Sequence, residues 1–384
     1  MHRRAVWIVA ACLLATGLAA CQTVTRPAFT YDQLAAASPD IRMDFVGGGD
    51  RDRFIDAMAG AVAATRDDRF DLLALSGGGA DGAYGAGVLV GWTGHGDRPE
   101  FEVVTGVSTG ALMAPFAFIG PEGDAELTEA FTDGRADRIL EARWAMALVG
   151  PGVFRQRPLR ALVAASIDQQ VLDRVAAGHR AGRRLYIATT SLDTQGQVIW
   201  DMGALAASGD PGSLALFIDL LTASASIPGV FPPLFIDIQR DGRRVRELHA
   251  DGRTTANFFV VPERLMLDPS LLPPDPSRPR GRIWIGVNGR PEASFSVAAF
   301  SGVGVAGRGL DAGGRGLKRD GRVAHHEGLP GCSVVDGFSG SAAGGAEAAS
   351  SAGCGRGIMT MRVRPFGLGE ALPPSSVKIS VRLL

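Results

Sequence analysis

Short apolar runs alternate with segments of helical spacing from residue 50 to about residue 290. The run Phe70–Leu75 (FDLLAL) ends in glycines and is typical of a buried strand. Further strands are predicted at 101–105, 184–190, 197–200 and 282–287, and helices at 50–66, 82–92, 109–119 and 213–224. Residues 122–178 are mostly helical in pattern, and residues 234–238 and 244–250 predict a hairpin around Asp241-Gly242. Strands that alternate with helices predict an α/β fold with a mostly parallel central sheet flanked by helices.

The composition narrows the class of protein. Apolar residues make up 46% and charged residues 21% of the 384 positions, which fits a folded protein with a sizeable core. Four cysteines cannot form a disulfide framework in a chain of this length. Basic and acidic residues number 39 and 40, so the net charge of -1 predicts no nucleic-acid partner. No spacing typical of metal ligands is present, and we expect no metal or other cofactor.

Residues 1–21 have the three-part form of an export signal. Arg3 and Arg4 precede an apolar run from Ala5 to about Leu14, and small residues then lead to Cys21. An N-terminal transmembrane helix is the alternative interpretation. The apolar run is shorter than the roughly 20 residues that a membrane span needs, which favours the export signal.

The end of this segment, Leu18-Ala19-Ala20-Cys21, resembles the lipobox of bacterial lipoproteins, in which the cysteine is lipidated and becomes the first mature residue. Gln22 follows, and in known bacterial lipoproteins a residue other than Asp at this place favours the outer membrane. The resemblance implies an envelope lipoprotein, held at a membrane surface through Cys21 and facing the periplasm. Residues 22–66 are then expected to form a polar tether, irregular to about residue 45, and an N-terminal helix.

The character of the sequence changes at about residue 291. Runs such as GRGLDAGGRGLKRDGR and GSAAGGAEAASSAGCGRG show neither helical nor strand period. Residues 291–384 are therefore expected to be either a flexible Gly/Ala-rich tail or the product of a shifted reading frame in GC-rich DNA. We expect no chemistry there, and this limits the folded domain to residues 67–290.

A glycine-rich loop follows the strand at 70–75. It reads Gly77-Gly78-Gly79-Ala80-Asp81-Gly82 and stands directly before a predicted helix. Glycines let a backbone approach a ligand closely, and successive N–H groups at the start of a helix bind anions. The segment also fits the dinucleotide-binding pattern G-x-G-x-x-G, and a plain tight turn is a further interpretation.

A second motif, Gly106-Val107-Ser108-Thr109-Gly110, again stands between a predicted strand and a predicted helix. In a nucleophile elbow of the form G-x-S-x-G, the serine lies on a strained turn with its hydroxyl exposed above the sheet. The flanking glycines are expected to avoid clashes with neighbouring strands. Ser108 is therefore a candidate nucleophile, and the alternative is a serine that only caps the helix at 109–119.

A third segment, Asp251-Gly252, follows the strand that ends at His249-Ala250, where a carboxylate is most often a turn residue. Together the three segments resemble the patatin-like phospholipase family, which carries a glycine-rich oxyanion loop, a G-x-S-x-G serine and an Asp-Gly-Gly or Asp-Gly-Ala aspartate in this order. The resemblance extends from about Phe70 to Pro262. It includes the stretches IATTSLDTQGQVIWD at 187–201 and ASASIPGVFPP at 223–233.

The resemblance implies a three-layer patatin-like fold and the hydrolysis of lipid esters without a cofactor. Ser108 would attack the ester carbonyl, and Asp251 would accept the serine proton. The oxyanion would be held by the N–H groups of Gly77, Gly78 and Gly79. The supporting motif residues would be Gly82, Gly106, Gly110 and Gly252. Such a dyad needs a partly desolvated pocket, because a carboxylate in water is a weak base for a serine hydroxyl.

Two positions depart from the family pattern. Asp81 stands in the glycine loop where the family usually has Lys or Arg, which removes a direct basic contact to an anionic phosphate. Arg253 stands where the family has Gly or Ala. A cation beside Asp251 would depress the pKa of the carboxylate unless Arg253 points into solvent.

Two other functions are compatible with the amino-acid sequence alone. An α/β-hydrolase with a Ser-His-Asp triad would need His325 or His326 in the tail, because His179 and His249 precede Asp251. A non-catalytic lipoprotein that binds lipid or nucleotide would use the glycine loop as a Rossmann turn. That turn requires an acidic residue at the end of the next strand, where this chain has the serine motif.

Overall fold

The computed structural model describes residues 26–45, 50–65, 69–135, 157–228, 230–260, 280–288, 358–361 and 379–383. The chain divides into two compact units. The smaller one combines Met1–Ser38 with Asp237–Arg246, and the larger one combines Pro39–Ile236 with Glu247–Leu384. The segment of residues 1–21, with the predicted lipidation site Cys21, lies outside the described residues. All residues of the candidate site belong to the larger unit.

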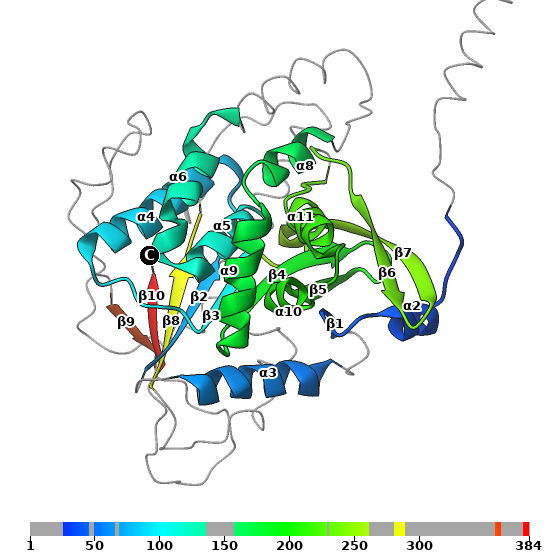
Figure 1. The fold of residues 1–384 in the computed structure, drawn as a ribbon, viewed down its shortest axis with the longest axis horizontal. Helices are drawn as coiled ribbons and strands as arrows, with labels where there is room; N and C mark the ends of the chain where they lie inside the picture. Colours follow the sequence, from blue (N-terminus) through cyan, green and yellow to red (C-terminus); the bar gives the residue numbers. More distant parts are fainter. Residues whose placement is uncertain are drawn as a thin grey trace, which may run out of the picture. The chain divides into compact units, whose positions relative to one another are not determined.

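The larger unit is built on a mixed sheet (Figure 1). In spatial order its strands are β1 (Arg42–Asp44), β5 (Gly196–Asp201), β4 (Arg184–Ser191), β3 (Val103–Val107), β2 (Arg69–Leu75), β8 (Arg280–Gly286), β10 (Ile379–Leu383) and β9 (Ile358–Met361). The five central strands from β4 to β10 run parallel, whereas β1, β5 and β9 are antiparallel to their neighbours. The predicted α/β class with a mostly parallel sheet is thus confirmed.

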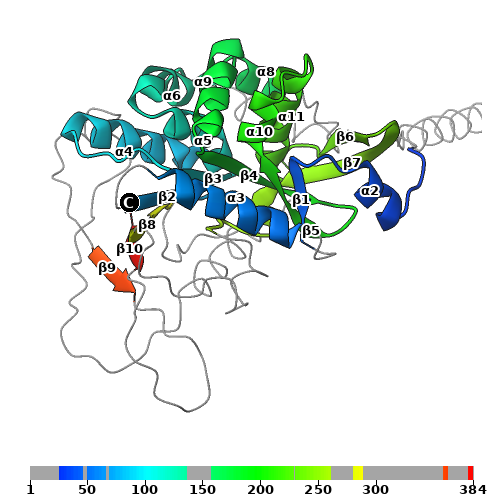
Figure 2. The same cartoon turned by 60° about the horizontal axis from the view of Figure 1, so that its bottom comes forward.

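Helices flank this sheet, as the sequence predicted. They are α3 (Arg51–Ala64), α4 (Gly82–His95), α5 (Thr109–Ile119), α6 (Asp124–Thr132), α8 (Arg157–Ala164), α9 (Gln169–Arg180), α10 (Met202–Ala207) and α11 (Ser213–Ser224). Figure 2 shows α5, α9, α10 and α11 together on one side of the sheet and α3 on the other. The bounds of α5 and α11 agree with the predicted helices at 109–119 and 213–224.

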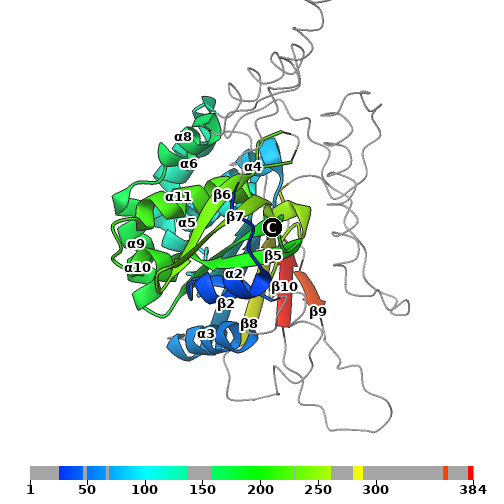
Figure 3. The same ribbon diagram turned by 90° about the vertical axis from the view of Figure 1, so that its right-hand side faces the viewer.

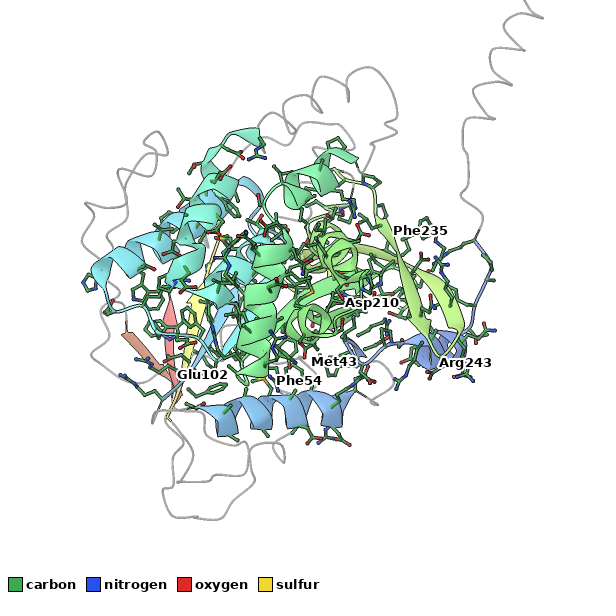
Figure 4. All side chains as sticks on the ribbon, viewed as in Figure 1. Met43, Phe54, Glu102, Asp210, Phe235 and Arg243 are labelled. Carbon is green, nitrogen blue, oxygen red and sulfur yellow. The ribbon has the colours of Figure 1, made fainter. Side chains whose placement is uncertain are left out.

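Aromatic side chains join α3 to its face of the sheet. Phe54 of α3 packs against Tyr186 of β4, with ring centroids 5.4 Å apart, and against Phe45, with centroids 5.9 Å apart. Met43 of β1 belongs to the same buried cluster and lies near Phe54 in Figure 4. Burial of a large side chain of this kind stabilises the fold by about 1.5–3 kcal/mol. The first strand and the first long helix are therefore part of the folded core.

The expectation of an irregular tether to about residue 45 was wrong for the described part of that segment. Residues Tyr31–Ala37 form helix α2, which begins with a capping box. Thr30 accepts a hydrogen bond from the backbone of Gln33, and the Gln33 side chain accepts one from the Thr30 N–H. Strand β1 then pairs with β5. The capping box was a readable signal in the sequence, whereas a strand of three residues shows no period.

The structure contains two strands after residue 291, in the segment whose glycine-rich runs show neither helical nor strand period. Strand β10 pairs in parallel with β8, and β9 pairs with β10 in antiparallel orientation (Figure 3). Other residues of the 291–384 segment lie outside the described part of the chain. These two strands extend the central sheet.

A β-hairpin carries the candidate base. Strands β6 (Leu234–Arg240) and β7 (Arg243–Asp251) pair around Asp241 and Gly242, both of which have positive φ angles of 50° and 77°. Two such residues in succession are typical of a type I′ turn, and the hairpin that the sequence predicted around Asp241-Gly242 is present. The hairpin returns the chain to the sheet so that β7 ends at Asp251, where it pairs with β4.

Candidate active site

Ser108 and Asp251 form a direct hydrogen bond. The Ser108 Oγ donates to Asp251 Oδ2 over 2.6 Å, and both residues are almost fully buried, at 2% and 1% exposure. The expectation of an exposed serine hydroxyl was therefore wrong for this structure.

The register of three strands explains why these two side chains meet. Strand β3 pairs with β4 as far as Val107, opposite Ala188. Strand β7 pairs with β4 from the next residue, with Asp251 opposite Thr189. Because β5 occupies the other edge of β4 at this level, β3 and β7 lie end to end along one edge. The residue after Val107 is therefore brought to the end of β7.

The backbone at Ser108 is strained, as a nucleophile elbow requires. Its φ and ψ angles are 54° and -123°, outside the regions that a non-glycine residue ordinarily adopts. A Cβ added at Gly106 would lie 2.6 Å from the Gly110 carbonyl oxygen, and one at Gly110 would lie 2.3 Å from that of Leu75. The prediction of a clash with a neighbouring strand is thus confirmed for Gly110, whereas Gly106 makes room for the helix that follows it.

The alternative interpretation of Ser108 as a helix cap does not hold. Ser108 stands at the N-cap position of α5, but its side chain makes no capping hydrogen bond. The hydroxyl proton is directed to the Asp251 carboxylate instead. Such a contact leaves the serine hydroxyl beside a potential proton acceptor.

The C-terminal end of α11 and the residues after it bind the backbones of both Ser108 and Asp251. The Ser224 Oγ accepts the Ser108 N–H over 3.0 Å and donates to the Ala188 carbonyl over 2.7 Å. Two residues later, the Ser226 carbonyl accepts the Asp251 N–H over 3.0 Å. One short segment, within the family-like stretch at 223–233, therefore fixes the backbones of Ser108 and Asp251 together. Sequence reasoning did not assign a role to either serine.

The glycine loop leaves two backbone N–H groups without a hydrogen-bond partner among the described residues, and not the predicted three. The Gly77 N–H donates to the Asn257 carbonyl over 2.9 Å and is thereby occupied. Its predicted role as an oxyanion donor was wrong in this conformation. Within the described part of the chain, the N–H groups of Gly78 and Gly79 have no hydrogen-bond partner, so they can receive a negative oxygen.

The carbonyl groups of the same loop are all occupied. Those of Ser76 and Gly77 accept hydrogen bonds from the Asn288 amide (2.6 Å) and the Ser76 Oγ (3.0 Å). Those of Gly78 and Gly79 accept from the Asp81 N–H (3.4 Å) and the Thr109 Oγ1 (2.8 Å). Because N–H and C=O point in opposite directions across a trans peptide, tied carbonyls leave the free N–H groups directed the other way.

Burial has the largest effect on the pKa of Asp251. Desolvation raises the pKa of the carboxyl group to about 6, although the hydrogen bond from Ser108, that from the Arg253 N–H and the Arg253 charge all lower it. The Arg253 N–H donates to Asp251 Oδ1 over 2.7 Å. The expected depression by Arg253 is thus present but smaller than the effect of burial. A carboxylate with a raised pKa is a stronger base for a serine proton.

The remaining motif positions lie beside this pair. A Cβ at Gly252 would lie 2.3 Å from the Ala188 carbonyl oxygen of β4, so the turn after Asp251 can pass β4 only with glycine there. A Cβ at Gly82 would lie 1.9 Å from the Thr109 methyl group. Asp81, the departure from the family pattern, is exposed immediately before α4. The glycine positions named from the sequence thus lie at close contacts around Ser108.

None of the described histidines contacts Ser108 or Asp251. His179 lies 3.7 Å from Asp201, and His95 contacts Asp97. His249 contacts Glu247 over 2.9 Å and Thr189 over 2.9 Å. The two residues that a Ser-His-Asp triad would need, His325 and His326, lie outside the described residues.

A buried ionic cluster adjoins β7, and no sequence pattern predicted it. The Arg42 guanidinium makes two hydrogen bonds to the Glu247 carboxylate, at 2.9 and 2.7 Å, and Ser191 donates to the same carboxylate over 2.6 Å. Burial favours the neutral acid, but contacts with His249 and Arg42 outweigh it and hold the pKa of Glu247 well below its usual range. The cluster ties β1 to the strand that ends in Asp251.

The family comparison agrees with this geometry. A model of the patatin-like phospholipase family matches residues 73–262, so this region of the chain is a patatin-like phospholipase domain. The matched region contains the glycine loop, Ser108 and Asp251. No curated protein matches the chain. Among solved structures, VipD from Legionella pneumophila is similar at 14% sequence identity with a TM-score of 0.32, over 57% of this chain and 50% of VipD.

No helix in the described part of the chain is both long and apolar enough to cross a bilayer.

Proposed function

We propose that this protein is a lipid acyl hydrolase that cleaves carboxyl esters of phospholipids or related lipids through Ser108 and Asp251. The observation that carries the proposal is the 2.6 Å hydrogen bond from Ser108 Oγ to a buried carboxylate whose pKa is raised to about 6. The patatin-like phospholipase domain supports the substrate class. No histidine in the described residues is placed to serve as an alternative base.

The reaction divides into acylation and deacylation. In acylation, the Ser108 Oγ attacks the ester carbonyl carbon while its proton passes to Asp251 Oδ2. The tetrahedral oxyanion accepts hydrogen bonds from the Gly78 and Gly79 N–H groups. Its collapse breaks the ester bond, and Asp251 returns the proton to the leaving alcohol. In deacylation, Asp251 takes a proton from water, the resulting hydroxide attacks the acyl-enzyme, and the fatty acid leaves as Ser108 regains its proton.

The test uses Ser108→Ala and Asp251→Asn. Each variant is expected to lose hydrolysis of a short p-nitrophenyl ester and of a phospholipid by at least about 10³-fold, because nucleophile and base act as a unit. For the same reason the double variant should be no worse than either single one. Retained activity in Ser108→Ala, or loss in a histidine variant with retention in Asp251→Asn, would contradict the dyad.

Stability provides the control for this experiment. The folded state must bury an ionised Asp251 above pH 6, which costs up to about 3 kcal/mol relative to the neutral acid. Asp251→Asn removes that cost and should be more stable to urea at pH 8 than the wild type. An inactive but stabilised variant separates the loss of chemistry from the loss of fold.

We also propose that the mature protein begins at Cys21, carries lipid there and is held at the outer membrane facing the periplasm. The charged start, the apolar run and Leu18-Ala19-Ala20-Cys21 support this. Two buried acyl chains suffice for stable anchoring, at about 0.8 kcal/mol per buried methylene. Labelled palmitate should be incorporated into the wild type in its bacterial host and not into Cys21→Ser. Equal labelling of both would contradict the anchor.

A further inference from the structure

We infer that Asn288 is a positioning residue for the two oxyanion donors, Gly78 and Gly79. This inference rests on the proposed hydrolase function. Asn288 lies two residues after the end of β8 and outside the 73–262 region that matches the family. It is 1% exposed and lies more than 200 residues from the glycine loop in the sequence.

Asn288 makes two hydrogen bonds to the residue that begins the loop. Its Nδ2 donates to the Ser76 carbonyl over 2.6 Å, and its backbone N–H donates to the Ser76 Oγ over 2.8 Å. The Ser76 hydroxyl in turn donates to the Gly77 carbonyl over 3.0 Å. A chain of donors therefore runs from Asn288 through Ser76 to the peptide group that contains the Gly78 N–H.

The peptide plane between Ser76 and Gly77 is held at both ends. Its carbonyl accepts from the Asn288 side chain, and its N–H donates to the Asn257 carbonyl over 2.9 Å. Loss of the Asn288 amide would leave the buried Ser76 carbonyl without this donor, and the plane could rotate about the flanking bonds. Rotation here changes the direction of the next N–H in the chain, which is that of Gly78.

The Asn288 amide also fills the space between the loop and α4. A Cβ added at Gly78 would lie 2.4 Å from the Asn288 Cβ, and one at Gly85 would lie 2.0 Å from its Oδ1. The glycine loop and α4 therefore both pack closely against the Asn288 side chain. Oxyanion donors act only when their direction is fixed before the reaction, so a residue that locks them changes the rate of the chemical step.

The experiment compares Asn288→Asp and Asn288→Ala with the full-length wild type in hydrolysis of a p-nitrophenyl ester. The aspartate keeps the size of the side chain but places an oxygen against the Ser76 carbonyl, and the alanine removes the donor without adding charge. We expect kcat to fall about 10- to 100-fold in both, with KM changed less than about threefold, because the donors act on the transition state. In Asn288→Ala the pH midpoint of the reaction should not move, because Asp251 is untouched and no charge is added.

Trp284→Phe is the matched control. It removes a buried donor from the same β8 strand, the Trp284 Nε1–H that bonds to Asp71 over 2.7 Å, without touching the loop. It should lower the unfolding temperature and leave kcat unchanged. Rates are expressed per active site, titrated to completion with a fluorophosphonate, so that any unfolded fraction does not enter kcat.

The outcomes separate the two hypotheses. An active wild type with equally active Asn288→Ala and Asn288→Asp overturns the role of Asn288 alone. A fall in kcat of the same size in Trp284→Phe also overturns it, because the effect would then be general loosening of β8. A wild type without Ser108-dependent hydrolysis overturns the proposed function and this role with it.

Discussion

At the scale of single residues, the site depends on one carboxylate that is costly to ionise. Burial raises the pKa of Asp251 to about 6, and the Arg253 charge and two hydrogen bonds reduce the shift without reversing it. Because the folded-state pKa lies above that of the unfolded chain, the stability contributed by protonated Asp251 is present below about pH 4. It is lost as the pH rises through about 6. The proposed mechanism uses the ionised form, so activity and stability are expected to change in opposite directions over this range.

The pH dependence of the reaction tests this assignment. We expect kcat/KM to rise with pH, to reach half its maximum near pH 6 and to remain level above it, because Asp251 accepts a proton only when ionised. Arg253→Ala removes the positive charge that lowers the pKa and should move the midpoint upward. The initial rates are measured from pH 4.5 to 9 in buffers of constant ionic strength. A midpoint that does not respond to Arg253→Ala would contradict Asp251 as the group that titrates.

At the scale of secondary-structure elements, the two proposed catalytic residues are positioned by segments distant in the sequence. Ser108 follows β3 and Asp251 ends β7, and their meeting depends on β4, which pairs with both. The C-terminal end of α11 then binds both backbones through Ser224 and Ser226. The strained elbow at Ser108 persists because these elements hold it from several sides.

Ser224 gives a test of this support. Ser224→Ala removes the acceptor of the Ser108 N–H, and a buried N–H without a partner costs about 1–3 kcal/mol. We expect lower stability by about that amount and a fall in kcat of roughly tenfold, because the strained elbow loses one of its contacts. Ser226→Ala is the matched control. Among the described residues the Ser226 hydroxyl bonds only to the Thr222 carbonyl, and the Ser226 backbone carbonyl remains in the variant. Equal kcat values in the two variants, measured on folded protein, would contradict a specific role for Ser224.

The sequence predicted the parts of the site that are local and not those that are distant. The glycine loop and the G-x-S-x-G motif each occupy a few consecutive residues between a strand and a helix, so both can be recognised from the amino-acid sequence alone. The contacts of Ser76 with Asn288 and of Ser108 with Ser224 join residues more than 100 positions apart. No period or spacing encodes such a pair. The occupied Gly77 N–H was missed for the same reason, because its acceptor is the Asn257 carbonyl.

At the scale of the whole molecule, the sheet extends beyond the region that resembles the family. Strand β8 pairs with β2 on one edge and with β10 on the other, and β9 follows at the border. The glycine-rich composition after residue 291 obscured the short strands at 358–361 and 379–383, since the long glycine-rich runs before residue 358 dominate the pattern. The strand that leads to Asn288 is therefore an interior strand of the sheet.

A chain that ends at residue 357 tests the contribution of these last strands. Truncation removes β9 and β10 and leaves the hydrogen-bonding groups of β8 unpaired along one edge. Each backbone hydrogen bond contributes about 0.5–1.5 kcal/mol, so four residue pairs predict a loss of at least about 2 kcal/mol in the free energy of unfolding.

Val381→Pro in the full chain is the control, because proline cannot donate to the ladder and should reproduce part of the loss without shortening the protein. Urea unfolding and Ser108-dependent ester hydrolysis are measured for both variants. A truncated chain with wild-type stability and activity would show that the sheet ends at β8 and that residues beyond it add nothing to the fold.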